Sequence, residues 1–191
     1  MGYSDALFRG HKLITHLSTP KGEVGFQIAT VPDAAALLAL RLEALAIHPE
    51  AFAADVDKTA ADGEKVWVER IIEYTNTKSG AIIIALAVDE LIGMSGIVRG
   101  HWPKTQHSGT LWGVYVKPDW RGYKIGEAIV NGSVEWAIEN NLTVVTLGVT
   151  NSNTSAIRCY TQCGFKVYGT APKAILYDSQ YFDDLLMVKL I

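Results

Sequence analysis

One stretch of the chain has the composition of a phosphate-binding turn. An apolar segment ends at Val116, Pro118 follows it, and Gly122 and Gly126 lie where a segment of helical periodicity begins. A strand, turn and helix of this kind present unpaired backbone N–H groups and the positive end of a helix dipole at one point. A phosphate or pyrophosphate is the ligand that such a turn favours, and an ordinary strand-to-helix connection containing a glycine is the alternative.

Two common phosphate-binding motifs are absent from the sequence. No G-x-x-x-x-G-K-S/T occurs, and no G-x-G-x-x-G is followed by an acidic residue about 20 positions later. The turn is therefore neither an NTPase loop nor a dinucleotide-binding fingerprint.

The spacing of apolar residues predicts the elements that must position this turn. Strands are expected over 24–28, 81–88, 91–98, 111–116, 144–149, 165–168 and 185–190, with a tight hairpin at Asp89 and Glu90. Helices are expected over 30–48, 59–74, 121–142 and 154–163. The order β-α-α-β-β-β-α-β-α-β-β predicts a mixed sheet with helices packed on it.

Composition indicates one soluble globular domain. The chain has 191 residues, 49% of them hydrophobic and 19% charged, with a formal net charge of −3. This excludes a disordered, collagen-like or small disulfide-stapled protein. Residues 1–22 are interpreted as an N-terminal extension with one added strand over 12–17, and residues 23–191 as the main domain.

The same composition excludes several kinds of partner. The longest apolar run, Ala81 to Val88, has eight residues, far fewer than the roughly 20 of a membrane span. The N-terminus lacks the apolar core of a secretory signal, so a cytoplasmic protein is expected. Without a clustered basic face, nucleic acid is not expected as a partner. Cys159 and Cys163 look like small core residues, and the five scattered histidines predict no metal site.

Two motifs together resemble the GNAT superfamily of acyl-CoA-dependent N-acetyltransferases. The family's pyrophosphate motif, R/Q-x-x-G-x-G/A, falls on Arg121 to Gly126, after a strand that ends V-x-P. A second pattern, N-x-x-A-x-x-x-Y-x-x-x-G-F, runs from Asn153 to Phe165 and includes Tyr160. The resemblance covers about residues 23–191. The chain departs from the family at Lys124, which stands where the family has its first glycine; a helical backbone there would tolerate the side chain.

The resemblance implies the fold and the co-substrate site. The fold is a mixed, mostly antiparallel twisted sheet of about seven strands, with helices on both faces and a splay between the central parallel strands 111–116 and 144–149. Acetyl-CoA would be the co-substrate. Its pyrophosphate would bind the backbone amides of residues 121–127, namely Arg121, Gly122, Tyr123, Lys124, Ile125, Gly126 and Glu127. Val114, Tyr115, Val116 and Asn153 would contact the pantetheine arm, and a backbone N–H near Val114 or Tyr115 would polarise the acetyl carbonyl.

The resemblance also places Tyr160 as the general acid near the sulfur of CoA, a core tyrosine being the other interpretation. The sequence does not identify the general base. Many relatives use a glutamate on the strand before the turn, but residues 110–113 of this chain contain no carboxylate. The candidates are Glu43, His107 and Asp183. In this fold the first two helices and the loop before the last strand wall the acceptor pocket, and the candidates to line it are Arg41, Glu43, Trp102, Tyr177 and Tyr181.

The implied function is transfer of an acetyl group from acetyl-CoA to a primary amine of a small molecule, an amino acid or a peptide. Direct attack in a ternary complex is expected, because neither cysteine has a nearby histidine to make it an acyl carrier. Two alternatives stay open: a non-catalytic acyl-CoA-binding sensor on the same fold, and transfer of a longer acyl chain. Edge strands and an apolar first helix are compatible with a homodimer, as in many relatives.

Overall fold

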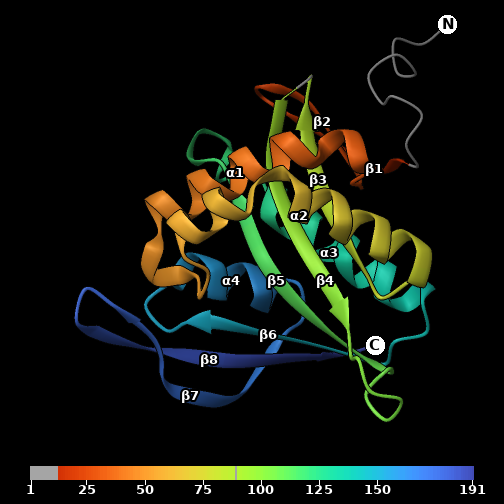
Figure 1. The fold of residues 1–191 in the computed structure, drawn as a ribbon. Helices are drawn as coiled ribbons and strands as arrows, with labels where there is room; N and C mark the ends of the chain where they lie inside the picture. Colours follow the sequence, from red (N-terminus) through yellow and green to blue (C-terminus); the bar gives the residue numbers. More distant parts are fainter. Residues whose placement is uncertain (1–12, 89) are drawn as a thin grey trace, which may run out of the picture.

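The predicted strands form one mixed sheet in the computed structural model, which describes residues 13–88 and 90–191 (Figure 1). The strands are β1 (Leu13–Thr19), β2 (Gly22–Ile28), β3 (Gly80–Ala87), β4 (Glu90–Arg99), β5 (Ser108–Val116), β6 (Val144–Thr150), β7 (Lys166–Tyr177) and β8 (Gln180–Leu190). Their spatial order is β1-β2-β3-β4-β5-β6-β8-β7. The added strand expected in the N-terminal extension is β1, so the sheet has eight described strands instead of about seven. Lys12 and Asp89 lie outside the described residues.

The helices begin and end at residues suited to those positions. They are α1 (Ala34–Ile47), α2 (Val56–Thr77), α3 (Ile125–Glu139) and α4 (Thr154–Gln162), with short 3-10 turns η1 (Val31–Asp33), η2 (Pro49–Ala51) and η3 (Pro118–Trp120). Thr30 and Asp33 form a capping box before α1, which ends just ahead of Pro49. Asp55 accepts the amide of Lys58 at 2.8 Å, so α2 begins earlier than the predicted residue 59.

Apolar residues on both faces of the central strands produce two hydrophobic cores. Successive side chains of a strand point to opposite faces, and along β3 Ile82 and Ile84 pack beneath α1 and α2 while Ile83 and Ala85 pack against α3. Figure 1 shows α1 and α2 in front of the sheet and α3 behind it. The predicted arrangement of helices on both faces is confirmed.

The sheet splays between β5 and β6, the one parallel pair among the described strands. Their pairing extends over Ser108–Val144, Gly109–Val145 and Thr110–Thr146 and then stops, although both strands continue. The backbone groups of the second half of β5 facing β6 are therefore released from the ladder. The splay predicted for the two central parallel strands is confirmed, and it opens at their carboxyl ends.

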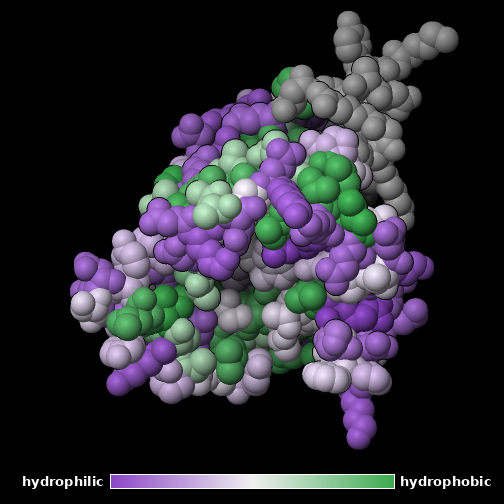
Figure 2. Space-filling view, in the orientation of Figure 1, coloured by the Kyte–Doolittle hydropathy of each residue, from purple (hydrophilic) through white to green (hydrophobic). Residues whose placement is uncertain are grey.

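The last two strands are longer than predicted. Strand segments were expected over 165–168 and 185–190, but β7 and β8 form a hairpin that continues to Tyr177 and Gln180. Pro172 and a register shift between Ala171 and Ile175 interrupt the hydrophobic alternation, which explains why spacing failed to detect the hairpin. Figure 2 shows hydrophobic side chains gathered over this hairpin, where Leu176 is 61% exposed. No helix within the described part of the chain is long and apolar enough to cross a membrane.

Candidate active site

A cavity of about 740 Å³ lies at the opening between β5 and β6. Its walls come from η2, the end of β5, the start of α3, the end of β6, and α4. The cavity brings together most of the residues that the sequence predicted for the co-substrate: Val114, Tyr115, Val116, Arg121, Gly122, Lys124, Ile125, Gly126, Glu127, Asn153 and Tyr160. Tyr123 does not line it, since this half-buried ring packs against the core beneath α3.

The start of α3 has the geometry of an anion-binding turn. The first described hydrogen bond of the helix runs from the amide of Ala128 to the carbonyl of Lys124, at 3.0 Å. The amides of Ile125, Gly126 and Glu127 therefore precede the helical ladder, and all three residues line the cavity. The positive end of the α3 dipole lies at the same place. Arg121, Lys124 and Arg158 add cationic side chains to the lining.

Lys124 does not have the right-handed helical backbone that would tolerate its side chain without strain. It is the N-cap of α3 with φ +61° and ψ +15°, in the left-handed region. This region is favourable for glycine and unfavourable for a residue with a Cβ atom, which is the physical reason for the family's glycine at this point. The lysine side chain is exposed at the cavity rim.

A bulge in β5 shapes the wall opposite α3. The pairing register of β5 with the neighbouring strand β4 shifts between Met94 and Gly96, and Gly113 has φ +64°. The indole of Trp112 occupies the space above Gly96, where a Cβ atom would lie 2.0 Å from the ring. This packing fixes the bulge, and Val114 and Tyr115, which directly follow Gly113, line the cavity.

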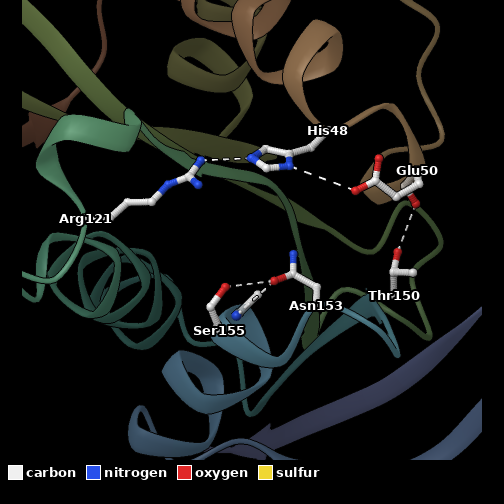
Figure 3. A network of polar contacts seen from close by, with 7 residues as sticks. His48, Glu50, Arg121, Thr150, Asn153 and Ser155 are labelled. Atoms are coloured by element: carbon white, nitrogen blue, oxygen red, sulfur yellow. Dashed lines mark hydrogen bonds and ion pairs between the residues drawn. The ribbon is translucent and has the colours of Figure 1, made fainter.

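Asn153 and Tyr160 lie on opposite ends of α4. The Oδ1 of Asn153 accepts the amide of Ala156 at 3.1 Å and the hydroxyl of Ser155 at 3.0 Å, which caps the helix. In Figure 3 the amide nitrogen of Asn153 points toward the space below His48. Tyr160 is 7% exposed and packs edge-on against Phe165. Burial raises the pKa of its phenol well above the usual value of 10, so the hydroxyl stays protonated and able to donate.

A polar chain across the cavity was not predicted from the sequence (Figure 3). Arg121 Nη2 lies 3.0 Å from His48 Nε2, and because arginine has only donors, this histidine nitrogen accepts. The ring proton then lies on Nδ1, 3.9 Å from Glu50 Oε1. Thr150 donates to the carbonyl of Glu50 at 3.2 Å and connects η2 to β6. The sequence feature that could have indicated this polar chain is the proline after His48. It ends α1 and directs the next residues into the cavity.

Glu43 lies beside the cavity and contacts one of its walls. The Tyr115 hydroxyl donates to Glu43 Oε1 at 2.9 Å, and Lys117 Nζ is 3.8 Å from Oε2. Burial, and then the hydrogen bond and charge of Glu43, raise the pKa of Tyr115 to about 12. Of the three base candidates, Glu43 is the one whose carboxylate contacts a cavity-lining side chain.

Two other predicted residues lie at the wrong end of β5. His107 and Trp102 belong to the loop before this strand, whereas the cavity is at the end of the strand. The nine residues of β5 separate the two ends by roughly 27 Å. The carbonyl of His107 accepts the amide of Thr143, and Trp102 is 70% exposed. Neither side chain reaches the cavity, so His107 is not placed to act as the base.

The β7–β8 hairpin carries three further predicted residues, and none of them lines the cavity. Asp183 Oδ1 accepts the amide of Lys173 at 2.7 Å, where that residue has φ +53°, so the carboxylate stabilises the irregular part of β7. Tyr177 and Tyr181 are 46% and 58% exposed. The length of the hairpin carries them beyond the cavity wall.

The two cysteines pack between α3 and α4. Cys159 lines the cavity and Cys163 is buried. The hydrogen bond that Cys159 donates to Cys163, and then burial, raise the pKa of the Cys159 thiol, which therefore stays protonated. Among the residues that the structure describes, no group of three or more His, Cys, Asp and Glu side chains is placed to hold a metal ion.

A splayed mixed sheet with an anion-binding turn and a buried tyrosine at the opening is the arrangement of an acyltransferase. The model of the acetyltransferase (GNAT) family matches residues 41–165, and the chain belongs to this family, whose members are N-acetyltransferases using acetyl-CoA as co-substrate. The protein is accordingly an enzyme of the acyltransferase class.

Individual relatives share less than 30% of their residues with this chain in the comparisons given below. A mycothiol acetyltransferase of Sanguibacter keddieii is 28% identical over 135 residues, which cover 70% of this chain but 40% of that protein. The chain thus spans less than half the length of that relative. A GNAT-family acetyltransferase structure from Streptococcus pneumoniae superposes with a TM-score of 0.78 at 19% identity, covering 88% of this chain and 99% of that one. The Salmonella typhimurium yncA structure, with its cofactor acetyl-CoA, has a TM-score of 0.71 at 17% identity and covers 87% of this chain and 93% of that chain. These two likenesses show the fold.

Proposed function

We propose that this protein transfers the acetyl group of acetyl-CoA to a primary amine of a small molecule, an amino acid or a peptide, by direct attack in a ternary complex. The observation that carries the proposal is the single cavity joining the α3 turn, the released end of β5, Asn153 and Tyr160. Its volume of about 740 Å³ lies within the usual range for small-molecule sites.

The lining suits each part of acetyl-CoA. The pyrophosphate would accept hydrogen bonds from the amides at the start of α3, with Arg121, Lys124 and Arg158 as cationic neighbours. The backbone of Val114 to Val116, which the splay leaves unpaired on the side facing β6, would pair with the amides of the pantetheine arm. The amide nitrogen of Asn153 would donate to the same arm, since its oxygen is used by the helix cap.

The proposed reaction needs no enzyme-bound acyl group. The amine nitrogen bonds to the thioester carbonyl carbon, the carbon–sulfur bond breaks, and the thiolate takes a proton from the Tyr160 hydroxyl. A backbone N–H near Val114 or Tyr115 stabilises the negative charge on the carbonyl oxygen during attack. The protonated state of Cys159 favours this direct route over an acylated cysteine.

The Glu43–Tyr115 pair provides a route for the proton that the amine loses. Tyr115 lines the cavity, and its hydroxyl donates a hydrogen bond to Glu43. Its oxygen can accept the amine proton while its hydroxyl proton moves to the carboxylate, so that one proton is lost by the amine and one is gained by Glu43. The route uses Glu43 as the base without requiring it to touch the amine.

A thiol-release assay tests the proposal. Acetyl-CoA is supplied with separate amines, amino acids, polyamines and short peptides, and calorimetry measures acetyl-CoA binding in parallel. Turnover with one acceptor class is the expected result. Acetyl-CoA binding without turnover on any acceptor would favour the sensor alternative, faster transfer from a bulkier thioester would favour the longer acyl chain, and absence of acetyl-CoA binding would overturn the site itself.

A further inference from the structure

Arg41 is a buried charge without a partner. It lies on the buried side of α1, between Leu40 and Ala44 along the chain's core-facing stripe, and is 8% exposed. Its guanidinium forms no hydrogen bond or ion pair with any residue that the structure describes, and its Nη1 atom is completely buried. Buried arginines are almost always paired, because an unpaired charge removed from water is strongly unfavourable. An anion from outside the described residues would supply the missing partner.

The surroundings of Arg41 hold the guanidinium in place without neutralising it. Its central carbon lies 4.5 Å from the centre of the Phe52 ring, a stacking contact that fixes the plane of the group. Gly113 faces it from the β5 bulge, where a Cβ atom would lie 3.6 Å from Nη1. Because residue 113 is glycine, no side chain from this position covers the nitrogen that lacks a partner.

A second arginine increases the positive charge. Arg70 of α2 is held over two indole rings: its central guanidinium carbon lies 4.9 Å from the centre of the Trp112 ring and 5.3 Å from that of Trp67. Burial, and then the charge of Arg70, lower the pKa of Arg41 to about 10, which still leaves Arg41 charged at neutral pH. The like charge of Arg70 makes the unpaired Arg41 less favourable and favours an anion beside it.

The position of Arg41 separates it from the phosphates of acetyl-CoA. Phe52 and Val114, the neighbours of the guanidinium and of Gly113, line the cavity. Arg41 and Arg70 come from the helices on one face of the sheet, whereas the anion-binding turn of α3 belongs to the core on the other face. Arg41 is not itself a lining residue; its guanidinium packs against Phe52, which lines the cavity on the side that remains for the acceptor.

We propose that Arg41, assisted by Arg70, binds an oxyanion carried by the acceptor, so that the acceptor is an amine bearing a carboxylate or a phosphate. The proposal rests on the proposed acetyltransferase function and specifies its substrate class. A guanidinium presents parallel donors that match either oxyanion. Amino acids and aminoalkyl phosphates meet this requirement, and polyamines do not.

Matched acceptors test the proposal. Initial rates with acetyl-CoA are compared for α-amino acids and their α-carboxamides, and for aminoalkyl phosphates and the corresponding amino alcohols. The charged member of a pair is expected to have a kcat/KM about 10- to 100-fold higher, and Arg41→Met should remove this preference while the KM for acetyl-CoA stays unchanged. The pair with the larger preference identifies the oxyanion. Equal rates within both pairs would overturn the proposal and leave the acetyltransferase function intact.

Stability distinguishes this role from a structural one. Replacing an unpaired buried charge by an apolar side chain of similar length is expected to leave the melting temperature unchanged or higher. Arg99, whose Nη2 donates to the Asn140 carbonyl far from the cavity, provides the control: Arg99→Met should keep the acceptor preference. If Arg41→Met fails to fold, Arg41→Lys and the wild-type comparison of acid and amide decide the question.

Binding gives a result even without turnover. CoA-loaded protein is titrated with N-acetyl-α-amino acids and N-acetyl-α-amino amides in a calorimeter. Tighter binding of the acids, lost in Arg41→Met, supports the oxyanion site even if the proposed function fails. Equal binding of acids and amides, together with equal binding of N-acetylaminoalkyl phosphates and the corresponding alcohols, overturns the site whatever the rates show.

Discussion

Tyr160 is the residue on which the proposed chemistry depends most directly. Burial holds its hydroxyl protonated, and the residue lines the cavity. Tyr160→Phe removes one oxygen and keeps the edge contact with Phe165, so the fold should be unaffected. We expect kcat to fall about 100-fold or more, because the thiolate then leaves without a proton donor, while acetyl-CoA binding measured by calorimetry is unchanged.

Tyr168→Phe is the matched control for this prediction. Tyr168 lies on β7, is 58% exposed and is not part of the cavity lining. Its replacement should leave both kcat and acetyl-CoA affinity at wild-type values. A Tyr160→Phe enzyme as fast as this control would show that Tyr160 is a core tyrosine and not the general acid.

Glu43 and Tyr115 form a pair whose titration can be followed. Glu43→Gln removes the carboxylate charge that disfavours the Tyr115 phenolate, so the pKa of Tyr115 should fall from about 12 but stay above 10, because burial is the larger cause of the shift. NMR of ring-labelled tyrosine measures this change. In the wild type, the stability due to the raised pKa is fully present below pH 10 and is lost as the pH rises through about 12.

The same substitution tests the proton route. Without Glu43, turnover at neutral pH should fall about 100-fold, and the rate should then rise steadily with pH as the free amine becomes more abundant. Glu135→Gln, an exposed position on α3, should keep the wild-type profile. A Glu43→Gln profile identical to this control would remove Glu43 from the mechanism.

At the scale of elements, the start of α3 combines anion binding with backbone strain. Lys124 adopts φ +61° there, which is unfavourable by roughly 1–2 kcal/mol for a residue with a Cβ atom. Replacing Lys124 by glycine would relieve this strain, but part of the stabilisation is offset by the greater freedom of glycine in the unfolded chain. Lys124→Gly is therefore expected to raise the free energy of unfolding by about 0.5–1 kcal/mol, as measured by urea denaturation.

Lys124→Ala separates the backbone from the charge. It removes the ammonium and retains the left-handed strain, so its stability should remain at or below that of the wild type. If the lysine binds a phosphate oxygen, both variants should weaken acetyl-CoA binding to the same extent at low salt. Equal stability of the glycine and alanine variants would contradict the assigned strain.

The elements with regular hydrophobic spacing could be predicted from the sequence. Strands β2 to β6 and all four helices were placed within a few residues, because each has one or two buried faces that impose a period. The β7–β8 hairpin was underestimated because its outer part faces solvent and contains Pro172. For the same reason Tyr177 and Tyr181 could not be positioned.

The parts of the site that belong to a local sequence motif could be predicted. The parts that tertiary packing brings to the cavity could not. The α3 turn, Asn153 and Tyr160 carry a recognisable pattern, and the structure gathers them in one cavity. His48 and Glu50 reach that cavity only through the packing of α1 on β4 and of η2 on β6, which local spacing does not reveal. The partnerless state of Arg41 is likewise a property of tertiary packing.

At the scale of the whole molecule, the cavity lies between two halves of the sheet that share little backbone pairing. Strands β5 and β6 pair over three positions, and the Thr150–Glu50 contact is an additional link between η2 and β6. A ligand that contacts β5 and α3 on one side and α4 on the other would connect the two halves. Binding should therefore stabilise the molecule as a unit and not one element alone.

Acetyl-CoA is accordingly expected to raise the melting temperature of the whole chain in a single transition. A ligand at about 100 times its Kd adds about 2.7 kcal/mol to the free energy of unfolding, which corresponds to roughly 5 to 10 °C for a domain of this size. Added salt should reduce the shift, because Arg121 and Lys124 are exposed cations at the phosphate end. Pantetheine, which lacks the pyrophosphate, should give a smaller shift with little salt dependence. A shift of equal size for both ligands would show that the start of α3 contributes nothing to binding, and would leave the splayed strands as the source of affinity.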